Sequence, residues 1–280
     1  TGYGDDVTFT TTQTVTDIDG NTYNTVQIGT QLWMQENLKT TQYRDGTNIP
    51  NVTDNTEWTN QSIGAYCYYN NDKATYGVTY GSLYNYYTTI DNHQLCPTGW
   101  HIPTDAEWTT LTDYLGGESV AGIKMKEVGL LHWSDPNTGS TNESNFLALP
   151  SGCRNYSTGT FYDIGFGGFW WSSTESEATK GFLRALYHDS QNIYRENYFN
   201  NYGYSIRCLQ GEGQVLPAVT TTLYSNLTST TATSGGNVTS DGNSTVTARG
   251  VVWSTNQNPT IDLLTKTEDG TGTGEFTSNV

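Results

Sequence analysis

The chain has 280 residues, with 12 Lys and Arg against 28 Asp and Glu, which gives a formal net charge of −16. An acidic chain without a basic run is a poor ligand for nucleic acid, whose phosphates are neutralised by Lys and Arg, and for anionic membrane surfaces. No apolar run approaches the roughly 20 residues of a membrane-spanning helix, so membrane insertion is not expected. The 13% of aromatic residues and the 30 Gly indicate a folded, turn-rich β protein.

The cysteines indicate an exported protein. The chain begins with Thr1 rather than Met, so we expect a processed or excised piece, and its length suggests two domains. Four cysteines, Cys67, Cys96, Cys153 and Cys208, are too widely spaced for a zinc motif. Their even number in an acidic, Tyr-rich and Thr-rich chain favours two disulfides and an extracellular or cell-surface location, with four buried thiols as the alternative.

Residues 1–13 and 218–280 differ in composition from the middle of the chain. The first stretch alternates Val7, Phe9 and Thr11 with polar residues and predicts one strand. The second stretch is rich in Thr and follows a Gly-rich linker at 211–217. It predicts strands at Val219–Leu223, Ser229–Val238 and Val246–Ser254, with Trp253 as the core ring.

This C-terminal stretch resembles the Ig-like or fibronectin-III-like modules that are repeated in large surface proteins of Bacteroidetes-type bacteria. The resemblance implies the opening strands of an all-β Ig-like sandwich, and residues 1–13 match the closing strand of a preceding module. We therefore expect a window from a longer array, in which neighbouring copies dock head to tail. A simple tail followed by a degenerate module is the alternative.

The sharpest helix signal lies in residues 14–210. Thr104 precedes Glu107 by three residues, which is a capping box, and Trp108 is followed by apolar residues at helical spacing. A Gly pair at 116–117 predicts the end of this helix. Three later runs, 146–154, 167–175 and 204–209, are predicted to be strands of one sheet.

Six motifs of this region match a known family. They read VTDIDGNTYNTVQIGTQLWMQENLKTT, YGSLYNYY, CPTGWHIPTDAEWTTL, LPSGCRN, WWSSTES and YSIRCL. In this order, residues 14–210 resemble the Fibrobacter succinogenes major paralogous domain. The resemblance implies an α+β C-type lectin-like domain with two helices on a twisted antiparallel sheet, and more distantly the formylglycine-generating enzymes. It also implies a Cys96–Cys208 disulfide and, with it, a Cys67–Cys153 disulfide.

Catalysis and metal binding have little support. Formylglycine-generating enzymes use a reactive cysteine pair shortly before their final strand, and no Cys lies between Cys153 and Cys208. The four His show no ligand spacing. Asp17, Asp19 and Asn21 alternate like the start of a calcium loop, but no Glu closes it. We expect no enzyme activity and no cofactor, with calcium left open but unsupported.

A ligand-binding surface is predicted after residue 182, where Tyr, Asn and Ser alternate. Tyr provides contact area at low entropic cost, and Asn and Ser provide adaptable hydrogen bonds. The candidate ligand-binding residues are Tyr187, His188, Asp189, Asn192, Tyr194, Asn197, Tyr198, Phe199, Asn200 and Tyr202. The sequence thus predicts a non-catalytic, extracellular surface or filament protein whose adhesion domain binds a glycan or protein ligand. The alternatives are a structural filament unit without small-ligand binding and a formylglycine-generating-type enzyme.

Overall fold

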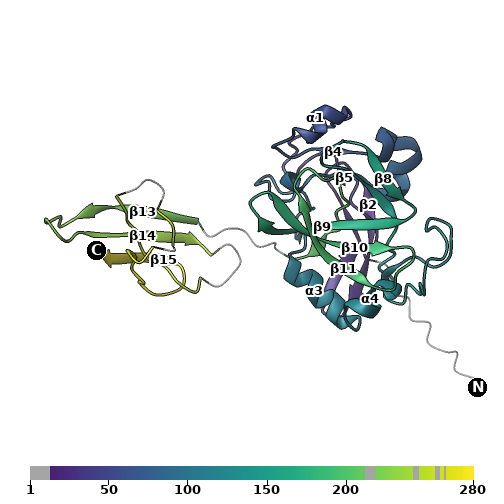
Figure 1. Ribbon diagram of the computed structural model, residues 1–280. Helices are drawn as coiled ribbons and strands as arrows, with labels where there is room; N and C mark the ends of the chain where they lie inside the picture. The colour runs from purple at the N-terminus through teal and green to yellow at the C-terminus, as the bar shows by residue number, and fades with distance from the viewer. Residues whose placement is uncertain (1–12, 212–217, 242–245, 256–258, 262) are drawn as a thin grey trace, which may run out of the picture. The chain divides into compact units, whose positions relative to one another are not determined.

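A computed structural model describes residues 13–211, 218–241, 246–255, 259–261 and 263–280 (Figure 1). The predicted closing strand at 1–13 lies outside these residues except for Gln13, and so does most of the predicted linker at 211–217. The chain forms two compact units, one ending at Gly211 and the other comprising the remainder. Each unit is described on its own.

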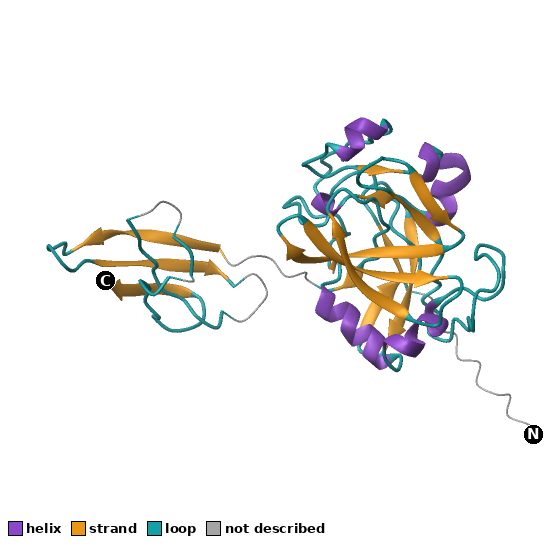
Figure 2. Cartoon of the chain, in the orientation of Figure 1, coloured by secondary structure: helices purple, strands orange, loops and turns teal. Residues whose placement is uncertain are grey.

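The first unit corrects the predicted fold class. The protein is mostly β: of the described residues, 35% lie in strands and isolated bridges and only 15% in helices, and the strands form several small antiparallel sheets and a half-barrel (Figure 2). The prediction of an α+β C-type lectin-like fold is therefore wrong. Gly, Thr, Asn and Tyr, which dominate the composition, all form helices less readily than Ala or Leu, and α3, the longest described helix, has ten residues.

Four sheets make up the first unit. The largest is five-stranded, in the order β1-β2-β3-β12-β6, and a three-stranded sheet has the order β11-β10-β9. Two further sheets are the pairs β4-β5 and β7-β8. The strands are β1 (Thr14–Thr16), β2 (Thr22–Ile28), β3 (Gln31–Met34), β4 (Tyr66–Cys67), β5 (Leu83–Tyr84), β6 (Trp100–His101), β7 (Ser151–Arg154), β8 (Phe161–Ile164), β9 (Gly167–Glu177), β10 (Lys180–Tyr187), β11 (Ile193–Phe199) and β12 (Leu209–Gln210).

The three runs that were predicted to share one sheet lie in three different sheets. The first run contributes β7, the second contributes β9, and the third reaches a ladder only in β12. Before β12, the chain crosses the core in extended form and makes single bridges, from Tyr204 to Tyr84 and from Ser205 to Trp170. Apolar alternation detected extended backbone correctly, but it carries no information on which strands become partners.

The helices are short, and two of them support the three-stranded sheet. The capping box predicted at Thr104 and Glu107 is confirmed at the start of α3. α3 and α4 contact β9, β10 and β11 and lie along one face of that sheet (Figure 1). The helices are α1 (Asn55–Thr59), α2 (Val78–Tyr80), α3 (Asp105–Tyr114) and α4 (Glu118–Met125), with 3-10 turns η1 (Tyr69–Asn71) and η3 (Tyr86–Thr88) and a π turn η2 (Lys73–Gly77).

One of the two predicted disulfides is present. The Cys96–Cys208 bond is confirmed, and it joins the segment before β6 to the segment before β12. The predicted Cys67–Cys153 bond is wrong, because both cysteines are free and buried. They belong to different apolar clusters: Cys67 packs with Trp58 in one, and Cys153 lies in the larger cluster of tyrosines.

The second unit is a single three-stranded sheet in the order β13-β14-β15. Its strands are β13 (Ala218–Ser225), β14 (Thr233–Ser240) and β15 (Gly274–Asn279). The stretch 246–254 is not a regular strand, although it pairs with residues 265–272 through one isolated bridge, between Val252 and Lys266, and through several backbone hydrogen bonds. Trp253, the predicted core ring, is 39% exposed. The predicted Ig-like sandwich is therefore wrong for the described residues.

Within the described parts of both units, no helix combines the length and the apolar character needed to cross a membrane.

Candidate functional site

The sheet β9–β10–β11 separates two environments. Because side chains alternate across a strand, Trp170 and Leu186 face α3 and α4 in one apolar cluster, whereas Phe169 and Leu183 face the tyrosine-rich cluster. On the helix side, the Asp105 carboxylate at the start of α3 pairs with Arg184 at 2.7 Å and with the guanidinium of residue 195 at 2.9 Å. These ion pairs tie the sheet to α3 and leave its other face for the site.

α4 holds the turn between β10 and β11. The buried Lys126 ammonium donates hydrogen bonds to the backbone carbonyls of Thr138, Tyr187 and Ser190, at 3.2, 3.2 and 2.8 Å. Gly122 allows α4 to approach closely, since a Cβ there would lie 2.5 Å from the carbonyl oxygen of Gln191. The turn that precedes the predicted binding strand is therefore held through its backbone carbonyls by Lys126 and by the close approach of α4.

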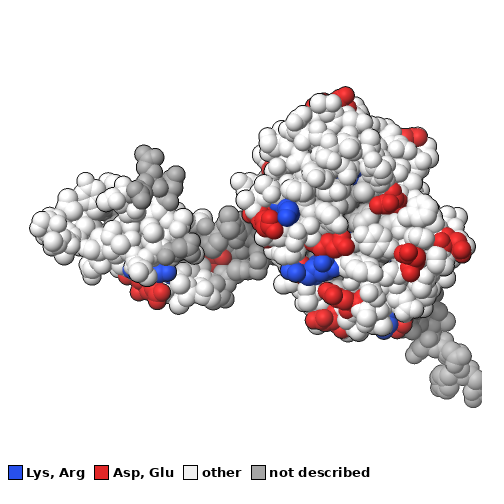
Figure 3. All heavy atoms as spheres, viewed as in Figure 1, with Lys and Arg blue, Asp and Glu red and all other residues white. Residues whose placement is uncertain are grey.

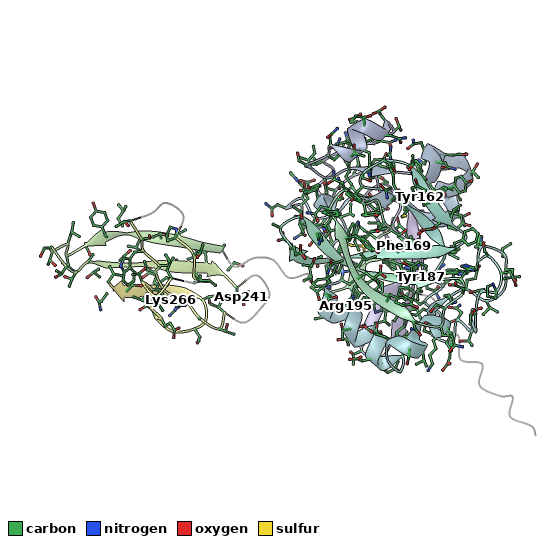
Figure 4. All side chains as sticks on the ribbon, in the orientation of Figure 1. Tyr162, Phe169, Tyr187, Arg195, Asp241 and Lys266 are labelled. Atoms are coloured by element: carbon green, nitrogen blue, oxygen red, sulfur yellow. A yellow bond between two sulfur atoms is a disulfide. The ribbon has the colours of Figure 1, made fainter. Side chains whose placement is uncertain are left out.

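A pocket of about 260 Å³ opens on the tyrosine-rich face of the sheet. It is lined by Cys153, Asn155, Tyr162, Asp163, Phe169, Tyr187, Tyr198, Tyr202 and Tyr204. These residues come from β7, β8, β9, β10, β11 and the extended segment after β11. Figure 4 labels Tyr162, Phe169 and Tyr187, which project from consecutive strands of this region. The pocket therefore depends on strands that are distant in sequence, and we call it the tyrosine pocket.

Ring contacts connect the floor of the tyrosine pocket to its walls. Tyr204 stacks on Phe169 at 5.3 Å and on Tyr202 at 5.2 Å between ring centroids. Phe169 meets Tyr187 nearly at a right angle, with 80° between the ring planes, and Tyr198 is tilted by 59° to Tyr202. The ring planes therefore lie at different angles, and they line an open pocket rather than a single flat platform.

Burial keeps the hydroxyls of these rings protonated. It raises the pKa of Tyr202 to about 12, and it raises the pKa values of Tyr187 and Tyr198 as well. The Asn155 amide donates to the Tyr202 hydroxyl at 3.4 Å, which helps to orient that ring. At neutral pH the pocket can therefore offer both apolar ring surface and hydroxyl groups that donate or accept hydrogen bonds.

Two carboxylates accompany the rings. Asp163 lines the pocket, and burial of its carboxyl group raises its pKa. Glu196 lies on β11 between Arg195 and the neighbouring pocket residues, and burial likewise raises its pKa, partly offset by a hydrogen bond from the Tyr198 hydroxyl. Its Oε2 is buried without a hydrogen-bond partner among the described residues. Figure 3 shows acidic side chains outnumbering basic ones on this face.

The structure brings together three of the ten predicted binding residues, Tyr187, Tyr198 and Tyr202, in the tyrosine pocket. Tyr194 lies beside them, packed against Tyr187 at 5.5 Å. Phe199 points elsewhere and stacks on Tyr156 at 4.5 Å.

The other five predicted residues lie outside the pocket. His188 bonds the backbone carbonyl of Asp135 at 2.8 Å, and Asp189 is exposed. Asn192 lies in the turn, where its backbone contacts α4. Asn197 is exposed on β11, and Asn200 is buried, with its backbone bonded to Thr179 and Tyr86. Strand alternation explains the placement of Asn197 alone; the other four residues lie in the turn between β10 and β11 or directly after β11.

Six pocket residues are not among the predicted binding residues. They are Tyr204 and five residues in or next to β7, β8 and β9, namely Cys153, Asn155, Tyr162, Asp163 and Phe169. One part of the sequence is typical of a turn, namely Asp163 followed by Ile and Gly. In the structure Asp163 has a positive φ of 63°, which Asp tolerates better than most residues. The pairing of β7 with β8 and the approach of β9 carry no comparable signal.

The two free thiols are poorly suited to nucleophilic chemistry. Burial raises the pKa of Cys153 to about 12 and that of Cys67 to about 12. Thiolate, the reactive form, is therefore scarce at neutral pH. In the described residues, no three His, Cys, Asp or Glu side chains gather as metal ligands. Asp17, the first residue of the proposed calcium stretch, accepts hydrogen bonds from Asn21 and from the Tyr23 hydroxyl.

Residues 26–210 match the sequence profile of the Fibrobacter succinogenes major domain. The match covers more than half of the chain, and the chain belongs to this family. Membership indicates a domain of a surface-type protein. Comparisons with curated proteins and with solved structures found no match.

Proposed function

We propose that the first unit is a non-catalytic binding domain of an extracellular or cell-surface protein, and that the tyrosine pocket is its ligand site. The single observation that carries this proposal is the pocket itself, with six aromatic rings and two polar side chains around a space of about 260 Å³. Ligand sites combine apolar and aromatic walls with a few polar groups in this way. The pocket is small, so it would hold one group of a larger glycan or protein ligand.

Two further observations support the proposal. The disulfide between Cys96 and Cys208 fits an oxidising compartment. The high pKa values of both free thiols weigh against a formylglycine-generating type of activity. A structural unit without ligand binding remains the competing function, and it would leave the pocket tyrosines without a role beyond packing.

An array of glycans and surface proteins, probed with the parent protein and two variants, tests the proposal. Tyr198→Ala removes a pocket ring that is 36% exposed, and Phe199→Ala removes its neighbour, which is 39% exposed but outside the pocket. The two variants are matched in strand and exposure. We expect Tyr198→Ala to abolish binding and Phe199→Ala to preserve it. Equal loss in both variants, or no binding partner for the parent, would contradict the proposal.

A further inference from the structure

The tyrosine pocket has the features of a site for an organic cation. The first feature is geometric: six of the nine residues that line this open pocket are aromatic, and the rings of Phe169, Tyr187 and Tyr198 stand at steep angles to their neighbours. Ring faces carry the negative part of the aromatic quadrupole and attract cations that lie within about 6 Å of the ring centroid. When several rings line one small pocket, their attractions for a single cation sum.

The second feature is the balance of charge. None of the nine lining residues is Lys, Arg or His, and Asp163 is among them. No ion pair joins Asp163 to any of the described cations. An unpaired carboxylate beside a low-polarity space attracts a positive charge and disfavours a negative one.

Three basic side chains near these strands are engaged. Arg154, between the lining residues Cys153 and Asn155, is fully buried, and its guanidinium donates hydrogen bonds to backbone carbonyls and to the Asn55 side chain. Lys126 directs its ammonium to three backbone carbonyls of the turn, and Arg195 lies on the helix side of the sheet, paired with Asp105. Glu196 adds a second carboxylate on the pocket side of β11, with one buried oxygen that lacks a partner among the described residues. Two carboxylates therefore lie on the pocket side of the strands, whereas the Arg154 guanidinium is directed to carbonyls away from the lining residues.

We propose that the tyrosine pocket binds an alkylated ammonium group, of the trimethylammonium type, held against the rings and neutralised by Asp163. This inference rests on the proposed function, because it takes the same pocket as the ligand site and names the chemistry of the group that enters it. A trimethylammonium group presents an apolar surface with a delocalised charge, and it donates no hydrogen bonds. It matches aromatic walls better than a compact, strongly hydrated cation does.

Calorimetric titration of the full chain with two isosteric probes tests the inference. Choline carries the trimethylammonium group, and 3,3-dimethyl-1-butanol has the same shape with carbon in place of nitrogen. We expect choline to bind at least about tenfold more tightly than the neutral isostere, since cation–π attraction and the carboxylate act only on the charged probe. Equal affinities, or no binding of choline, would overturn the inference.

Variants separate the two sources of attraction. Asp163→Asn removes the charge but keeps the size of the side chain, and Asn tolerates the positive φ at this position. It should weaken choline and leave the neutral isostere unchanged. Tyr198→Phe should retain choline binding and Tyr198→Leu should lose it. If Tyr198→Leu binds choline like the parent, the site lies elsewhere and the inference fails. Unchanged circular dichroism and melting temperature of each variant establish that it is folded.

A parallel titration with N-acetyl-trimethyllysine amide distinguishes a protein side chain from a free choline-type group as the natural source. A preference of either charged probe over the neutral isostere supports the inference. Failure of the cation inference can be distinguished from failure of the proposed function. An array partner that is lost in Tyr198→Ala, together with no response to either charged probe, would refute the cation and retain the pocket.

Discussion

Trp108 offers the most demanding test of how the first unit is held together. Its side chain is fully buried in the second turn of α3, and its ring centroid lies 4.7 Å from that of Trp33 and 5.9 Å from that of Phe146. A Trp side chain buries roughly 200 Å², which at about 25 cal/mol per Å² corresponds to about 5 kcal/mol. We expect Trp108→Ala to lower the free energy of unfolding by about 3–5 kcal/mol.

The indole Nε1 of Trp108 sharpens this prediction, because it is buried without a hydrogen-bond partner among the described residues. An unsatisfied buried donor costs about 1–3 kcal/mol. Trp108→Phe removes that donor while keeping an aromatic ring, so its destabilisation should be less than half that of the Ala variant. Urea unfolding followed by far-ultraviolet circular dichroism measures both. A cost below about 1 kcal/mol for the Ala variant, or equal costs for the two variants, would refute the reasoning.

Three further predictions concern the supports of the site. Replacing Cys96 and Cys208 together by Ser should lower the free energy of unfolding by about 2–5 kcal/mol, because the disulfide closes a long loop. Thiol titration of the unfolded parent protein should find two free thiols, and four free thiols would contradict the structure. Burial lowers the pKa of Lys126 from 10.5 to about 8, so the unfolded state binds more protons than the folded state between these pH values. The free energy of unfolding, relative to that of Lys126→Met, should therefore rise with pH across this window. A difference between the two proteins that does not change with pH would contradict this prediction. Gly122→Ala should lower the free energy of unfolding by more than about 1 kcal/mol although Ala is the better helix former, because its Cβ would lie 2.5 Å from the carbonyl oxygen of Gln191. A higher melting temperature of this variant would contradict the prediction and show that the turn can move away from α4.

Sequence patterns predicted local features better than their assembly. The capping box at Thr104 and the buried Trp108 are encoded within a few residues, and both are present. The family resemblance implied two disulfides: the Cys96–Cys208 bond is present, and the Cys67–Cys153 bond is absent. Which strands become neighbours depends on long-range packing of aromatic side chains, and the pattern within each strand does not contain that information.

The candidate site shows the same limit. The predicted stretch 187–202 supplies three residues to the tyrosine pocket. Strand alternation and the turn direct the rest away from it, as with Phe199, which stacks on Tyr156. The residue composition identified the strand β11 correctly. Which of its side chains face the pocket depends on the register of β11, and the opposite wall of the pocket is formed by β7 and β8. A prediction that respected the two-residue period of β11 would have separated Tyr198 from its neighbour.

The most direct test of the central claim is a tyrosine-specific NMR titration of the full chain with a ligand that the array or the choline experiment identifies. Tyr187, Tyr198 and Tyr202 line the pocket, whereas Tyr114 and Tyr224 are exposed by 66% and 67% and lie outside it. With ring carbons labelled, the signals of the three pocket tyrosines should shift in proportion to bound ligand, and those of the two exposed tyrosines should stay in place. Shifts confined to the exposed tyrosines, with the pocket signals unchanged at saturation, would contradict the assignment of this pocket as the ligand site.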